Sequence, residues 1–269
     1  MIAVIAVACV PPPPTFVVEP ELPSTRESNW LERATSLRTS LGRAGIALEM
    51  RGARTQLESS DCAVGKRRCI RCALIGERDR VSDTALAELV AAFMRYPVEF
   101  LDAAKIARVA LCKDLNNHSS VEPGGIADPK DRVLYVNLKG LVAGGRGGYS
   151  VEEVAQIGHH EIYHLFDLPE VFPRDDFEWE QLNPRGFVYG RHRGETRPFG
   201  FVNAYAATNA VEDRASTFEY LMARGEELCA LARIDPKVAG KARLVWRRVA
   251  AVANIGFVGA GVSCAAELQ

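Results

Sequence analysis

The 269-residue chain has only five histidines and no apolar run of the ~20 residues that a membrane-spanning helix needs. Its 33 lysines and arginines nearly balance its 34 aspartates and glutamates, so the formal net charge is −1. No global field therefore attracts nucleic acid, and we expect no nucleic-acid partner. The C-x-x-C motif of Cys69 and Cys72 has no second copy, which disfavours a structural zinc site with four cysteines.

The cysteines that are present favour disulfides instead. There are seven of them, Cys9, Cys62, Cys69, Cys72, Cys112, Cys229 and Cys264. If Cys9 carries a lipid, the other six can form three disulfides in an oxidising compartment. Cys229 and Cys264 can join each other, whereas the sequence leaves the remaining connectivity open.

The N-terminus indicates export. The apolar stretch MIAVIAVACV is followed by four consecutive prolines. It resembles an export signal, and Cys9 resembles the lipidated cysteine of bacterial lipoproteins. No Lys or Arg precedes the apolar run and Ala6 stands where that pattern prefers leucine, so a plain apolar N-terminus is the alternative. We interpret residues 1–27 as a signal with a proline-rich linker. The expected location is the bacterial cell surface or periplasm, with a lipid on Cys9 as a membrane tether.

Residues 28–269 are expected to form one domain. Apolar periodicity predicts helices from residue 28 to about 45, at 83–95, at 150–166, at 209–232 and from 235 onward. Alternating patterns predict strands at 46–52, 106–112 and 132–138. Long loops are expected at 53–80 and 168–207. This order predicts an α+β fold with a small sheet packed on the helix at 150–166.

That helix contains three of the five histidines, in the sequence IGHHEIYHLF. His160 and His164 are four residues apart and therefore share one face of the helix. Two imidazoles at this spacing can bind one zinc ion at ~2.0–2.1 Å. Glu161 lies about 100° round the helix from His160, where it can take a proton from a zinc-activated water. The set matches H-E-x-x-H, and His159 is expected to be a supporting or surface residue.

A third ligand has to come from another element, and three residues qualify. Glu170 follows His164 by six residues, as in zincins with the longer H-E-x-x-H-x-x-G-x-x-H motif. Asp167, however, stands where that motif has the glycine that turns the chain. His192 lies in a basic loop. Glu212 lies on the predicted helix after the long loop, which is the gluzincin arrangement, and we favour it.

The stretch GHHEIYHLFD, with FEWEQLNPRGFVYG and GFVNAYAATNAVEDRASTFEYLM further on, resembles the zinc-binding metallopeptidases of bacteria, many of which are lipoproteins. It is similar, more remotely, to the catalytic domain of anthrax lethal factor. The resemblance covers roughly residues 84–224. It implies a zincin-like metalloprotease domain with a helical C-terminal part. It also implies His160, His164 and Glu212 as Zn²⁺ ligands and Glu161 as general base.

Two further roles follow from the resemblance. Tyr205 stands seven residues before Glu212, where its phenol can donate to the oxyanion of a tetrahedral intermediate. The fourth residue after the glutamate ligand is acidic in that family and hydrogen-bonds a zinc-binding histidine, whereas here it is Ser216. Asp167 or Asp213 can take over the orientation of an imidazole, and we favour Asp167.

We therefore expect a zinc-dependent hydrolase that cleaves peptide bonds in a peptide or protein substrate. A non-catalytic, surface-anchored binding protein on the same scaffold is the alternative, which Ser216 favours. Hydrolysis of a non-peptide amide also stays open. An extended substrate can add to the strand at 132–138 if that strand is a sheet edge.

Overall fold

The computed structural model describes residues 30–50, 55–63, 69–117, 122–142, 148–167, 176–191, 196–259 and 262–265. The predicted signal and linker lie outside these ranges, as do Cys9, Glu170 and His192. Among the helices that are described, none is long and apolar enough to cross a membrane.

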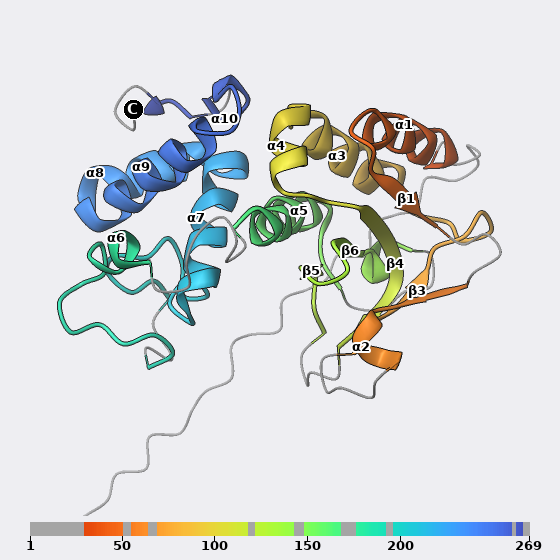
Figure 1. Cartoon of the computed structure of the whole chain (residues 1–269), viewed down its shortest axis with the longest axis horizontal. Helices are drawn as coiled ribbons and strands as arrows, with labels where there is room; N and C mark the ends of the chain where they lie inside the picture. Colours follow the sequence, from red (N-terminus) through yellow and green to blue (C-terminus); the bar gives the residue numbers. More distant parts are fainter. Residues whose placement is uncertain are drawn as a thin grey trace, which may run out of the picture.

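The chain folds as a mixed α+β structure, as the sequence predicts (Figure 1). The strands are β1 (Ala47–Glu49), β2 (Gln56–Glu58), β3 (Arg71–Leu74), β4 (Arg108–Asn116), β5 (Gly125–Asp128) and β6 (Val133–Asn137). The helices on the sheet side are α1 (Trp30–Arg43), α2 (Ser60–Ala63), α3 (Asp83–Met94) and α4 (Val98–Ala103). The later helices are α5 (Val151–Phe166), α6 (Phe177–Glu180), α7 (Ala210–Ala223), α8 (Gly225–Ile234), α9 (Pro236–Ala250) and α10 (Gly256–Gly259).

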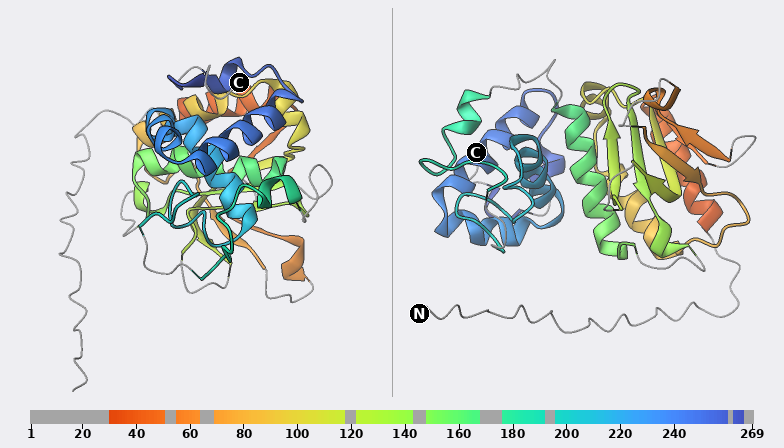
Figure 2. Two further views of the ribbon diagram at one scale, coloured as in Figure 1. Left: turned by 90° about the vertical axis from the view of Figure 1, so that its left-hand side faces the viewer. Right: turned by 90° about the horizontal axis from the view of Figure 1, so that it is seen from below.

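Helix α5 lies between two parts of the molecule. The sheet, with α1, α3 and α4, lies on one side of it, and the group α6 to α10 lies on the other (Figures 1 and 2). α5 packs against α3, β5 and β6 on the first side and against α7 on the second. The histidine motif therefore lies where these two parts meet.

The sheet has the order β2-β3-β4-β6-β5, with β1 paired to the first half of β4. β4 and β6 are parallel, whereas β5 runs antiparallel to β6. β6 therefore has a neighbour on both sides, and the prediction that the strand at 132–138 forms a sheet edge is wrong. Among the described strands, the edge beside α5 is β5. Its sequence, GIAD, is too short and too weakly patterned to predict a strand.

The structure also differs from the sequence prediction in two loops and one helix. The predicted loop at 53–80 contains β2, α2 and β3, which are each only three or four residues long. The loop at 168–207 contains the single-turn helix α6. The helix predicted at 209–232 is two helices, because α7 ends at Ala223 and α8 begins at Gly225, a residue with low helix propensity.

Three disulfides are present, Cys62–Cys69, Cys72–Cys112 and Cys229–Cys264. The last is the pair that the sequence suggested. The two cysteines of the C-x-x-C motif bind different partners, so this motif is neither a redox pair nor half of a zinc site. Disulfides are typical of chains that fold in an oxidising environment, so the structure supports export from the cytoplasm.

Candidate metal centre

The helix that carries the histidine motif is fixed at its N-terminus. The Ser150 side chain accepts a hydrogen bond from the Glu153 amide, and the Glu153 carboxylate accepts one from the Ser150 amide. This is the predicted capping box. Apolar side chains on α5 such as Val154, Ile162 and Phe166 are buried, which fixes the rotation of the helix and leaves His160 and His164 facing α7.

The structure brings together His160, His164 and Glu212, the three residues that we expect as ligands. The Oε2 atom of Glu212 lies 2.9 Å from Nε2 of His160 and 3.2 Å from Nε2 of His164. Donors at zinc-bond lengths on the corners of a tetrahedron are roughly 3.3 Å apart, so these separations suit three ligands of one ion. His160, Glu161 and His164 also offer donor atoms within 4.8 Å of one another. This group can hold a metal ion.

The second nitrogen of His160 has a carboxylate partner that the sequence did not reveal. Its Nδ1 atom lies 3.2 Å from Oε2 of Glu219, whose side chain is 15% exposed. Metal-binding histidines commonly donate their other N–H to a carboxylate, which orients the ring and selects its tautomer. Glu219 follows Glu212 by seven residues, about two helical turns, so both acids lie on one face of α7. That spacing is the signal that could have identified it.

Asp167 and Asp213, which we expected to support an imidazole, bind cations instead. The Asp167 carboxylate accepts a hydrogen bond from the Arg214 guanidinium, and both side chains are buried. Asp213 pairs with the Lys241 ammonium at 2.7 Å. Each acid is buried beside a cation on α7 or α9, where pairing offsets the cost of removing the charge from water.

Ser216 makes no hydrogen bond to either histidine. It is buried, and its hydroxyl has no hydrogen-bond partner among the described residues. It lies one turn after Glu212 on α7, and Glu219 lies nearly one turn further on. The acid that supports His160 therefore stands at position 219 of α7 and not at position 216, and the serine does not leave the imidazole unsupported.

The two carboxylates control the charge of His160. Burial lowers the pKa of His160, but hydrogen bonds to Glu212 and Glu219 outweigh it and raise the pKa to about 10. Burial alone would raise the pKa of Glu212, and its hydrogen bonds to His160 and His164 lower it well below its usual range. The metal-free site therefore holds an imidazolium between two carboxylates. A metal ion at Nε2 has to replace a proton.

Zinc binding at neutral pH should release about one proton from the site, because His160 must lose its Nε2 proton to become a ligand. The raised pKa also implies that His160 stabilises the metal-free fold fully below pH 6.5 and that this contribution is lost as pH rises through about 10. Calorimetric titration with zinc in two buffers of different ionisation enthalpy measures the proton count. A count of zero would mean that His160 is neutral before zinc binds.

His159 is buried and therefore is not a surface residue. Its Nδ1 atom lies 2.5 Å from the Tyr96 hydroxyl. Burial and the nearby charge of Arg95 lower the pKa of His159 to about 3, so the ring is neutral. It anchors α5 to the segment that follows α3.

The two predicted catalytic residues, Glu161 and Tyr205, lie beside the candidate ligands. Oε2 of Glu161 accepts a hydrogen bond from the Ala127 amide of β5 at 2.8 Å. The ring of Tyr205 lies 5.7 Å from that of His160, and its side chain is 55% exposed. Partial burial and the charges of Glu212 and Glu161 raise the pKa of the Tyr205 phenol. It therefore keeps its proton and can act as a donor.

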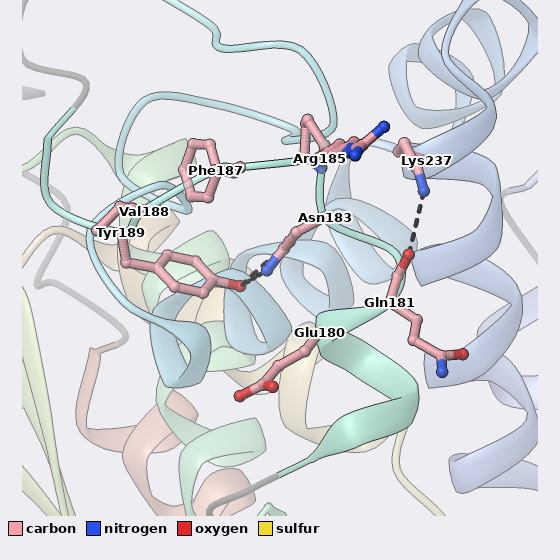
Figure 3. Close-up of a pocket in the computed structure, with 10 residues that line it drawn as sticks. Glu180, Gln181, Asn183, Arg185, Phe187, Val188, Tyr189 and Lys237 are labelled. Carbon is pink, nitrogen blue, oxygen red and sulfur yellow. Dashed lines mark hydrogen bonds between the residues drawn. The ribbon is translucent and has the colours of Figure 1, made fainter.

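Residues 176–191, a described part of the segment between α5 and α7, pack against α7. Trp179 is fully buried and donates through Nε1 to Oδ2 of Asp213 at 2.9 Å. The Tyr189 hydroxyl donates to the same oxygen at 2.8 Å and accepts from the Asn183 amide at 3.1 Å. Figure 3 shows Tyr189 and Asn183 facing each other in the wall of a surface pocket. These side chains hold α7 from behind, next to Glu212.

Comparison with protein families, with curated protein sequences and with solved structures finds no match for this chain. The geometry of the centre is therefore the basis on which its chemistry can be argued.

Proposed function

We propose that the chain is an exported zinc metallopeptidase of the gluzincin type. The observation that supports this most is that Oε2 of Glu212 lies within 3.2 Å of Nε2 of both His160 and His164. Two histidine nitrogens and one carboxylate oxygen are typical ligands of catalytic zinc sites, which keep a fourth coordination position open. The position of α5 between the sheet and the helical group is consistent with a zincin-like fold.

The residues around the ligands suit peptide-bond hydrolysis. A bound zinc ion supplies Lewis acidity, which polarises a carbonyl group and lowers the pKa of water. Glu161 is adjacent to a ligand but accepts its hydrogen bond from Ala127, so its other oxygen can take the proton of the attacking water. Glu161 can then pass this proton to the leaving amine. The Tyr205 phenol can donate to the oxyanion.

An extended peptide can bind along β5 and not along β6, which has neighbours on both sides. β5 is an edge strand next to α5, and its backbone groups that point away from β6 can pair with a substrate backbone. A peptide held there passes close to Glu161. Attachment of the enzyme to a membrane through a lipid on Cys9 is part of the proposal and depends on the N-terminal sequence alone.

Replacing the general base should separate catalysis from metal binding. We expect the zinc-loaded wild type to cleave a quenched fluorescent mixture of unstructured peptides. Glu161→Gln should lose at least about 100-fold in rate, because the amide cannot accept the proton of water. Elemental analysis should find the same zinc content in both proteins.

A non-catalytic binding protein predicts a different result. Wild type would then bind zinc but cleave no peptide in the mixture, and Glu161→Gln would be indistinguishable from it. Ser216 is the sequence feature that favours this alternative. The contact of Glu219 with His160 argues against the binding-protein alternative. Glu219 supplies the carboxylate partner of the imidazole that Ser216 cannot provide.

A further inference from the structure

We infer that the edge strand β5 positions the general base: the backbone N–H of Ala127 holds Glu161, and Gly125 leaves the space that this contact requires. Both are positioning residues, because neither touches the reacting atoms. The inference rests on the proposed function for its catalytic consequence. The contact itself depends only on the register of β5 and the packing of α5.

The register of β5 explains why the Ala127 N–H is available. Ile126 pairs with Tyr135 and Ala127 with Leu134 in an antiparallel ladder. The Asn137 amide donates to the Gly124 carbonyl, so residue 124 faces β6. Because orientation alternates along a strand, the N–H and C=O groups of residues 125 and 127 point away from β6. At a sheet edge such groups lack a strand partner, and here Glu161 accepts from one of them at 2.8 Å.

Gly125 is required by the close approach of α5. A Cβ atom at this position would lie 2.7 Å from Cγ of Glu161 and 2.7 Å from Cγ2 of Ile157, which is closer than real contacts allow. The backbone at Gly125 does not have a positive φ, so space and not conformation selects glycine. Even one methyl group would have to displace the stem of Glu161 or the helix that carries it.

The contact fixes one oxygen of Glu161 and leaves the other for catalysis. A glutamate has several side-chain rotamers, and the charged carboxylate is held in one of them by a hydrogen bond from a rigid strand. Misplacement of a catalytic group by about 1 Å can cost on the order of 100-fold in rate. The same contact also limits substrate binding. A peptide that adds to β5 can use the outward groups of Gly125 and the Ala127 carbonyl, but the Ala127 N–H is already occupied.

Two substitutions test the catalytic consequence. Ala127→Pro removes the N–H, and proline is tolerated where the missing N–H faces away from the ladder. Gly125→Ala introduces the methyl group that meets Glu161. We expect each to lower kcat roughly 10- to 100-fold with zinc content and KM little changed. Gly158→Ala on α5 is the control, because its Cβ would meet only Leu89, at an ordinary 3.5 Å. Wild-type kcat in Ala127→Pro and Gly125→Ala would overturn the positioning role.

Hydrogen exchange tests the contact without relying on catalysis. In ¹⁵N-alanine-labelled protein the Ala127 amide should be protected although it lies on a sheet edge, and Glu161→Ala should remove this protection. The amide of Leu134 in the central strand β6, observed in a uniformly labelled sample, should stay protected in both. Equal, fast exchange of Ala127 in wild type and variant would refute the contact even if zinc-dependent hydrolysis is found. Protection that depends on Glu161 in a protein without hydrolytic activity would uphold the contact while the proposed function fails.

Discussion

A Glu212→Ala variant should lose its metal during dialysis, whereas wild type should keep about one zinc ion per chain. Glu212 contributes the single oxygen that lies near both histidine nitrogens. Without it, two imidazoles from one helix would have to hold the ion alone. We expect the loss of zinc affinity to exceed that of any substitution outside the ligand set, together with complete loss of hydrolysis. Elemental analysis of the dialysed proteins measures the first effect and peptide cleavage the second.

Two comparison variants make this result specific. Glu219→Ala removes the support of His160 but no ligand, so its zinc affinity should fall by only about 10- to 100-fold. Glu170→Ala should keep its zinc, although Glu170 is the competing candidate for third ligand. Zinc loss in Glu170→Ala and retention in Glu212→Ala would show that the ligand set is the compact one with all ligands close in sequence.

A Lys241→Met variant should lose about 3–5 kcal/mol of unfolding free energy. The Lys241 side chain is 1% exposed, and its ammonium lies 2.7 Å from Oδ2 of Asp213 and 2.8 Å from the Gly200 carbonyl. It also lies 3.7 Å from the centre of the Phe201 ring. Methionine fills a similar volume but leaves the Asp213 carboxylate buried without a cation. Urea unfolding of the metal-free proteins measures the difference without a contribution from bound zinc.

Lys237 provides a matched control on the same helix. Its ammonium donates to the Gln181 carbonyl at the surface, as Figure 3 shows, and Lys237→Met should change stability by no more than about 0.5 kcal/mol. Adding Asp213→Asn to Lys241→Met should recover part of the lost unfolding free energy, because the double variant no longer buries a carboxylate without a cation. Equal stability of wild type and Lys241→Met would mean that the charge of Lys241 does not contribute to the fold.

The sequence predicted those parts of the fold that carry a regular signal. The capping box at Ser150 and the apolar periodicity that follows it located α5 correctly, and helical spacing placed His160 and His164 on one face. The pairing with Glu212 came from a family resemblance and not from spacing, because no local pattern shows that α7 returns to α5. The structure brings the three residues together.

The remaining parts of the site have no local signature. β5 is four residues long and begins with glycine, so neither the strand nor the backbone contact from Ala127 to Glu161 could be predicted. Glu219 was missed because the family pattern places the supporting acid one turn after Glu212, three residues too early. Asp167 and Asp213 are close to the ligands in sequence, but proximity in sequence does not set their partners. The burial of particular faces of α7 and α9 pairs them with Arg214 and Lys241.

The order of the disulfides along the chain has a consequence for biogenesis. Each bridge joins one cysteine to the next cysteine in the sequence, so the three loops are consecutive and none encloses another. A chain that crosses a membrane N-terminus first would expose these cysteines pair by pair. An oxidant that joins thiols in their order of emergence would then produce the native pattern without later shuffling. Cys9 is the exception, since it emerges first and has no partner among these bridges. A lipid on its sulfur would remove the thiol that could otherwise capture Cys62 and shift every later pair by one.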